Sequence, residues 1–133
     1  MNDRRTELGW TLVRVVFGLS LAWGHGLPKL AGGHMDQFAA GVAELGFPFP
    51  LYFAWAAAVA EFAGGIFVAL GFFTRPAAAV AAFTMLVAIY RHRLQGFGER
   101  ELAMLYCAAM IAFLIGGAGR FSVDGRMKKP KYF

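Results

Sequence analysis

Two charged residues, Arg14 and Glu61, each interrupt a long apolar stretch of the sequence. At the centre of a bilayer a charged side chain costs about 2.5–3.5 kcal/mol on insertion scales, so each needs a partner, neutralisation or a function. Counted along ideal helices, the two side chains could meet, which makes an Arg14–Glu61 ion pair one hypothesis. The other is that the Glu61 carboxyl is protonated. Either arrangement could be a structural tie or a site that binds a ligand or handles protons.

The histidines suggest a second kind of chemistry. His25 lies at the outer end of the first apolar stretch and His92 just past the third, on the same predicted side of a membrane, and two imidazoles at one depth could ligate haem. However, His92 lies between Arg91 and Arg93, a setting typical of a membrane interface. No cysteine, histidine or carboxylate spacing matches a zinc site, and the single cysteine cannot form an internal disulfide. The sequence therefore predicts no metal site.

Aromatic side chains gather toward the same side as His25. One interpretation is an interfacial aromatic belt, because tyrosine and tryptophan concentrate there in membrane proteins. Another is a pocket for a flat amphiphile such as a quinone, with His25, Lys29, Arg91 and Glu101 as polar contacts. The aromatic residues concerned are Trp23, Tyr52, Trp55, Tyr90 and Tyr106. From these residues, the candidate ligand-binding set is Arg14, His25, Lys29, Glu61 and Tyr106.

The amino-acid composition indicates the class of protein that positions these residues. Of 133 residues, 59% are hydrophobic and 16% charged, and the mean hydropathy is +0.54. Soluble domains average about 45–50% apolar and about 25% charged residues, so a soluble enzyme is disfavoured. No P-loop, dinucleotide-binding glycine motif, nucleophile elbow or H-E-x-x-H motif is present.

Four apolar stretches predict an all-α integral membrane four-helix bundle, a single domain over residues 1–133. The predicted spans are residues 8–27, 51–73, 76–90 and 102–118. A spanning helix needs about 20 residues, so the third is short unless its flanking arginines extend it. None of the stretches alternates with period two, which argues against strands. Small residues recur at four-residue spacing, as at Gly18, Ala22 and Gly26, and favour close helix packing.

The connection over residues 28–50 has its own pattern. Met35, Phe38, Val42 and Leu45 recur at helical spacing, Asp36 could cap the start, and Gly46 could end the segment. This pattern predicts a short amphipathic helix that lies in the interface between the first two spans. An irregular loop is the alternative.

Basic residues predict the orientation. With four spans, one side holds both termini and eight bases, against four bases on the other, so both termini are expected in the cytoplasm. The basic tail over residues 128–131 would then face anionic lipid, and nucleic acid is the poorer partner. The richer side carries Arg4, Arg5, Arg75, Arg120, Arg126, Lys128, Lys129 and Lys131, and the other side carries Lys29, Arg91, Arg93 and Arg100.

Residues 24–30 (GHGLPKL) contain a G-x-x-K-[LFI] element, and residues 61–65 (EFAGG) and 70–75 (LGFFTR) contain E-x-x-G-G and L-G-x-x-T-R elements. Together with a fourth segment, these segments resemble the DoxX family. Residues 116–124 (GGAGRFSVD) are similar to its G-P-G-x-x-S-[LIV]-D ending, with Ala118 in place of the frequent proline. Arg14 stands where the family commonly has an arginine. The motif positions are Arg14, Lys29, Glu61, Thr74, Arg75, Ser122 and Asp124.

This resemblance implies a multi-pass protein of the bacterial inner membrane whose relatives include subunits of quinone-coupled oxidoreductase systems. The leading hypothesis is accordingly a small membrane subunit of an oxidoreductase system that offers a quinone-facing or anchoring surface. Its expected partners are the lipid bilayer and other membrane subunits or further copies of the chain. Quinone is the candidate cofactor, and whether the chain is an enzyme stays open. The alternatives are a structural accessory protein that binds no small molecule and an oligomeric carrier of protons or small solutes.

Overall fold

The computed structural model of the protein describes residues 3–127, apart from the side chain of Glu99. Over these residues the chain forms helices and no strands, which confirms the all-α prediction. The elements are α1 (Arg4–Leu21), the π-helical turn η1 (Ala22–Gly26), α2 (Leu27–Ala31), α3 (Met35–Glu44), α4 (Pro50–Leu70), α5 (Thr74–Arg91), α6 (Phe97–Gly116) and α7 (Val123–Arg126).

Four long helical segments correspond to the four predicted spans, with different ends. The first runs without a break from α1 through η1 and α2, over residues 4–31 where residues 8–27 were predicted. Its charged ends stay helical because arginine and glutamate are good helix formers. Conversely, α4 stops at Leu70 because Gly71 follows with φ of 69°, a left-handed conformation that ends helices.

By length and composition, one helix among the described residues could cross a membrane, namely α4. In α5 and α6 the charged residues lie close to the helix ends, whereas α1 has Arg4, Arg5 and Glu7 near its start and Arg14 in its middle. A single such helix is weak evidence of a membrane protein, because the core helix of a soluble protein has the same properties.

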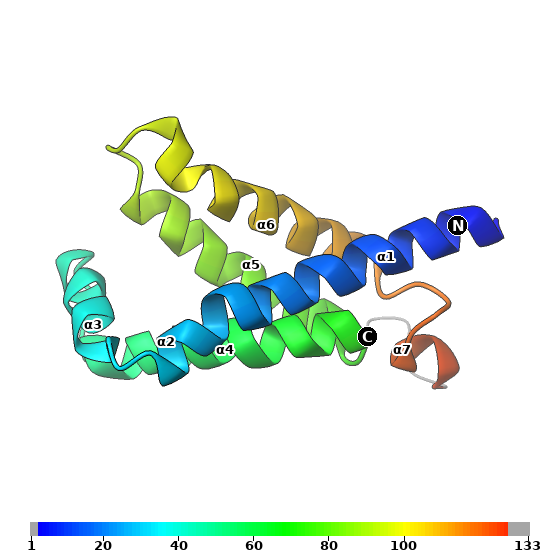
Figure 1. Ribbon diagram of the computed structural model, residues 1–133, viewed down its shortest axis with the longest axis horizontal. Coiled ribbons are helices and arrows are strands. Elements are labelled where there is room, and N and C mark those ends of the chain that lie inside the picture. The colour runs from blue at the N-terminus through cyan, green and yellow to red at the C-terminus, as the bar shows by residue number, and fades with distance from the viewer. Residues whose placement is uncertain (1–2, 128–133) are drawn as a thin grey trace.

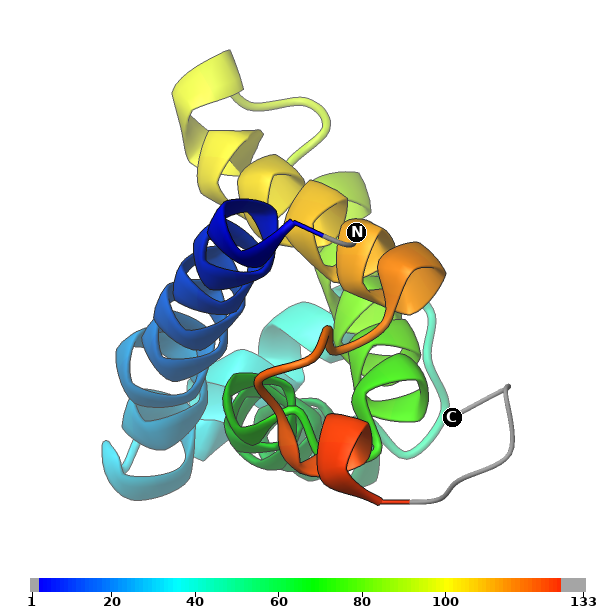
Figure 2. The same ribbon diagram turned by 90° about the vertical axis from the view of Figure 1, so that its right-hand side faces the viewer.

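Helix α4 is the centre of the arrangement, and it contacts α1, η1, α2, α3 and α5. Figure 1 shows α1 running alongside α4, and the end-on view in Figure 2 shows α1 and α5 on either side of α4. Helices α4 and α5 are joined by residues 71–73 alone, so they are antiparallel neighbours as predicted. The largest apolar core lies mainly between α5 and α6 and includes Met110 and Phe113, both fully buried.

The predicted amphipathic helix is α3, which lies across one end of the bundle (Figure 1). Its Met35, Ala39 and Val42 are buried against Ala54 and Ala58 of α4. The period of 3.6 residues in this segment is therefore confirmed as a helix with one buried face. Its position in a membrane interface stays a prediction.

Helices α1 and α4 approach each other through glycine. A Cβ atom added to Gly18 would lie 2.5 Å from the Gly65 carbonyl oxygen, and one added to Gly65 would lie 2.5 Å from the Gly18 carbonyl oxygen. Backbone atoms on both sides leave no room for a side chain. The small residues predicted to allow close packing in the first span therefore do so against α4.

Candidate functional site

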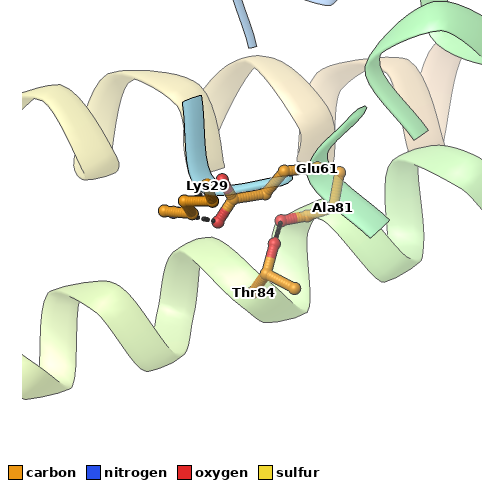
Figure 3. Close-up of polar contacts among 4 residues, drawn as sticks. All are labelled: Lys29, Glu61, Ala81 and Thr84. Carbon is orange, nitrogen blue, oxygen red and sulfur yellow. Dashed lines mark hydrogen bonds and ion pairs between the residues drawn. The ribbon is translucent and has the colours of Figure 1, made fainter. Parts of the chain in front are cut away.

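Glu61 forms an ion pair with Lys29 and not with Arg14. The Lys29 Nζ atom donates hydrogen bonds of 2.8 and 2.7 Å to the two carboxylate oxygens, Oε1 and Oε2 (Figure 3). The Glu61 side chain is 3% exposed and that of Lys29 is 29% exposed. The predicted Arg14–Glu61 pair is therefore wrong.

The helix path explains this pairing. Residues 22–26 form a π-helical turn, so the chain continues as helix into α2 and does not leave the bundle at residue 27. Gly26 lies directly on the backbone of Phe62, which brings α2 against α4. Lys29 follows three residues later on the same helical face and so meets Glu61.

The ion pair borders an apolar cavity of about 410 Å³ between α3, α4 and α5. The Phe38 ring lies under the Lys29 ammonium, with Nζ 4.9 Å from the ring centroid, and so supports it through a cation–π contact. The Thr84 hydroxyl donates a 2.7 Å hydrogen bond to the Ala81 carbonyl (Figure 3). The lining residues are Lys29, Phe38, Val42, Leu45, Phe47, Phe53, Ala56, Ala57, Ala60, Glu61, Val80, Phe83, Thr84, Val87, Ala88, Arg91 and His92. Such a space suits a largely apolar ligand with one polar end.

Arg14 lies at the opposite end of α4 from this cavity. Gly18 packs on Gly65 and Ala69, and because α1 runs antiparallel to α4, Arg14 lies one turn farther from Glu61. The Arg14 side chain is 2% exposed, and its guanidinium donates to the carbonyl oxygens of Ala118, Phe121 and Ala69. It therefore holds the loop after α6 against the bundle.

Asp124 and Thr74, two further motif residues, hold the same loop in place through hydrogen bonds. The Asp124 carboxylate accepts hydrogen bonds of 3.0 and 2.9 Å from the backbone N–H groups of Phe73 and Thr74, and one of 2.8 Å from the Thr74 hydroxyl. Its own backbone N–H donates to the Gly71 carbonyl at 2.7 Å. Asp124 thus caps the start of α5.

Further contacts complete this C-terminal clasp, by which we mean residues 115–125 and the groups that bind them. Ser122 caps α7 by accepting from the Gly125 N–H at 2.9 Å, and Arg75 donates to the Ile115 carbonyl at 3.4 Å. Glu7 accepts from the Arg120 N–H at 2.7 Å. Five of the seven motif residues therefore hold structure, whereas Lys29 and Glu61 face a cavity.

Removing the Asp124 carboxylate tests the clasp. Asp124→Ala leaves the first N–H groups of α5 without an acceptor, and we expect a loss of about 2 kcal/mol in the free energy of unfolding. Chemical denaturation in detergent measures it. The control is Asp36→Ala, which removes an exposed carboxylate from the first turn of α3 and should cost less than about 0.5 kcal/mol. Equal losses in the two variants would contradict the capping role.

His25 and Tyr106, the remaining candidates, do not line this cavity, although His25 is close enough to Lys29 and Glu61 to interact with both charges. Their rings are in edge-to-face contact with centroids 5.2 Å apart, and Tyr106 also contacts Phe17 at 5.7 Å. Their predicted role as ligand contacts stays a prediction.

The other aromatic and histidine residues take different positions. Trp23, Tyr52 and Tyr90 are more than half exposed, which agrees with outward-facing rings. The His92 imidazole is 2.7 Å from the Gln95 side-chain oxygen. Over residues 3–127, no group of three or more histidine, cysteine, aspartate or glutamate side chains is placed to hold a metal ion.

The chain matches a family model over more than half of its length. The DoxX family model matches residues 9–93, which contain Arg14, Lys29, Glu61, Thr74 and Arg75. The resembling segment at residues 116–124 lies outside the matched part. No curated protein and no solved structure matches the chain significantly. Because the match covers more than half of the 133 residues, the chain belongs to the DoxX family of small membrane proteins.

Proposed function

We propose that the chain is a multi-pass protein of the bacterial inner membrane with both termini in the cytoplasm. The segment α1–η1–α2 and the helices α4, α5 and α6 would each cross the membrane. Large apolar side chains project from all four, including Leu12 at 65%, Val59 at 50%, Phe83 at 61% and Leu105 at 53% exposure. A surface of this kind is suited to lipid. The excess of basic residues on the side of the termini supports the orientation.

We further propose that it is a membrane subunit of an oxidoreductase system and that it binds a quinone in the cavity beside Lys29 and Glu61. The observation that carries this proposal is an apolar cavity whose lining includes four phenylalanine residues and one ion pair. A quinone has a flat ring, a long apolar tail and two oxygen atoms, so its shape and polarity match that lining. Relatives' links to quinone-coupled systems support the same ligand class.

The Lys29–Glu61 ion pair can hydrogen-bond to both the oxidised and the reduced form of a quinone ring. Two of the three Lys29 N–H groups are directed at Glu61, and the third can donate to a carbonyl oxygen of the ligand. The Glu61 carboxylate can accept a hydrogen bond from a ligand hydroxyl. A bound quinone would supply the electron transfer, while this chain's residues would position the ring and exclude water. Electrons would come from a partner chain.

Filling the cavity tests this proposal. Ala57 lines the cavity, whereas Val59 lies two residues away on α4, is half exposed and does not line it. We expect Ala57→Phe to reduce the quinone retained by the purified protein by at least about tenfold, and Val59→Phe to change it less than about twofold. Chromatography of lipid extracts measures the retained quinone. Wild-type protein that retains lipid but no added quinone would contradict the proposal and favour a structural accessory role.

A further inference from the structure

A second hollow, of about 310 Å³, adjoins the first cavity next to α3, the helix that lies across one end of the bundle in Figure 1. It is lined by Pro28, Lys29, His34, Gln37, Phe38 and Arg91. Lys29, Phe38 and Arg91 line both spaces. The polar groups of the hollow are therefore cationic or neutral, and no carboxylate lines it.

Among the residues that line this hollow, Arg91 is unusual in its hydrogen bonding. It is half-buried, yet its guanidinium makes no hydrogen bond and no ion pair with any group that the structure describes. The neighbouring Arg93 differs, because it donates to the Tyr90 carbonyl at 2.7 Å and stacks on the Tyr90 ring. A guanidinium with five N–H donors is rarely left without acceptors when it is partly removed from water.

Gly41 of α3 makes room for this side chain. A Cβ atom at Gly41 would overlap the Arg91 guanidinium, so the absence of a side chain at residue 41 allows the guanidinium to lie against α3. Lys29 adds no net charge to the site, because its own positive charge is matched by Glu61. One positive charge, that of Arg91, therefore remains uncompensated among the lining residues.

From these contacts we infer that the hollow is an oxyanion site in which Arg91 binds a phosphate group, with His34 and Gln37 as further polar contacts. The planar guanidinium can bind two phosphate oxygens at once, which distinguishes it from a lysine ammonium. The phosphate could belong to the headgroup of an anionic phospholipid or be free in solution. The first source is consistent with a place at the helix ends, where headgroups lie. This inference does not depend on quinone binding.

The experiment compares two arginines that stand two residues apart. Purified wild-type protein, Arg91→Gln and Arg93→Gln are each titrated with phosphatidylglycerol in detergent, and bound lipid is counted by native mass spectrometry. Both variants lose one positive charge. We expect Arg91→Gln to weaken phosphatidylglycerol binding at least about fivefold and Arg93→Gln to weaken it less than about twofold. Equal weakening by the two variants, or no weakening by Arg91→Gln, would overturn the inference.

Two further arms complete the test. Inorganic phosphate is added as competitor: displacement of the lipid at millimolar phosphate supports a site for free phosphate, and retention of the lipid supports a headgroup site. If the wild type binds neither, the inference is overturned. Gly41→Ala keeps the net charge and displaces only the flexible end of Arg91, so it should fold and weaken binding as Arg91→Gln does. If Arg91→Gln does not fold, unchanged binding by Gly41→Ala overturns the inference.

Discussion

Replacing Lys29 by methionine is expected to destabilise the protein by about 3–5 kcal/mol, because it leaves the Glu61 carboxylate buried without a counter-charge. Glu61→Gln should lower the free energy of unfolding less than Lys29→Met does. The Lys29 side chain is 29% exposed, so its ammonium can reach water when the Glu61 carboxylate is removed. The Glu61 side chain is 3% exposed, so its carboxylate cannot reach water when the Lys29 ammonium is removed. The double variant should recover part of the larger loss, with a coupling energy above about 1 kcal/mol.

Denaturation of the wild type, both single variants and the double variant in the same detergent supplies this cycle. A second cycle with Arg14→Met and Glu61→Gln is the control, since Arg14 binds the Ala69 carbonyl, about two helical turns along α4 from Glu61, and the two changes should be additive within about 0.5 kcal/mol. If the effects of Lys29→Met and Glu61→Gln are additive, or those of Arg14→Met and Glu61→Gln are coupled, the Lys29–Glu61 pairing is contradicted.

Gly65→Leu is expected to destabilise the protein by at least about 3 kcal/mol, because the new side chain has no space between α4 and α1. The first atom beyond Cα would lie 2.5 Å from the Gly18 carbonyl oxygen and 2.8 Å from the Ala22 nitrogen. Both are backbone atoms and cannot move without separating the helices. The midpoint of thermal unfolding in detergent measures the loss.

Gly9→Leu is the matched control for this substitution. Gly9 also lies in a long helix, α1, but a Cβ atom added there has no neighbour within 4 Å. Leucine is a better helix former than glycine, so Gly9→Leu should leave stability unchanged or raise it by up to about 1 kcal/mol. A loss at Gly9 as large as that at Gly65 would show that helix packing at Gly18 and Gly65 is not the cause.

Much of the fold could be predicted from apolar length and periodicity. The four long helical segments, the α3 helix and the antiparallel neighbours α4 and α5 all follow from those patterns. The ends could not be predicted as well, because hydropathy cannot show that charged residues such as Arg4 and Arg5 continue a helix.

The ion pair of Glu61 was assigned to the wrong partner for a related reason. Lys29 follows Pro28, which suggests a helix end, yet the π-helical turn at residues 22–26 lets the chain remain helical through both residues. Arg14 instead binds backbone carbonyls of the loop after α6. Every residue has a carbonyl, so sequence alone does not indicate such acceptors.

The candidate ligand site was predicted in part. Lys29 and Glu61 border the cavity. Glu61 was a candidate because its charge interrupts an apolar stretch, and Lys29 because it lies at the depth of His25 and at a motif position. His25 and Tyr106 were placed with Lys29 by depth along the helices, but depth does not determine which way a residue faces around the bundle. Their rings contact each other and do not line the cavity.

The central claim is that the cavity beside Lys29 and Glu61 is where this protein binds a quinone, and photolabelling tests it most directly. Membranes containing the protein are irradiated with a photoreactive quinone analogue, and labelled peptides are identified by mass spectrometry. We predict labels on cavity-lining residues of α4 and α5, such as Phe53 and Phe83, and loss of these labels in Ala57→Phe. Labels confined to the end of the bundle that holds Arg14 and Asp124, or labels unchanged when the cavity is filled, would contradict the claim.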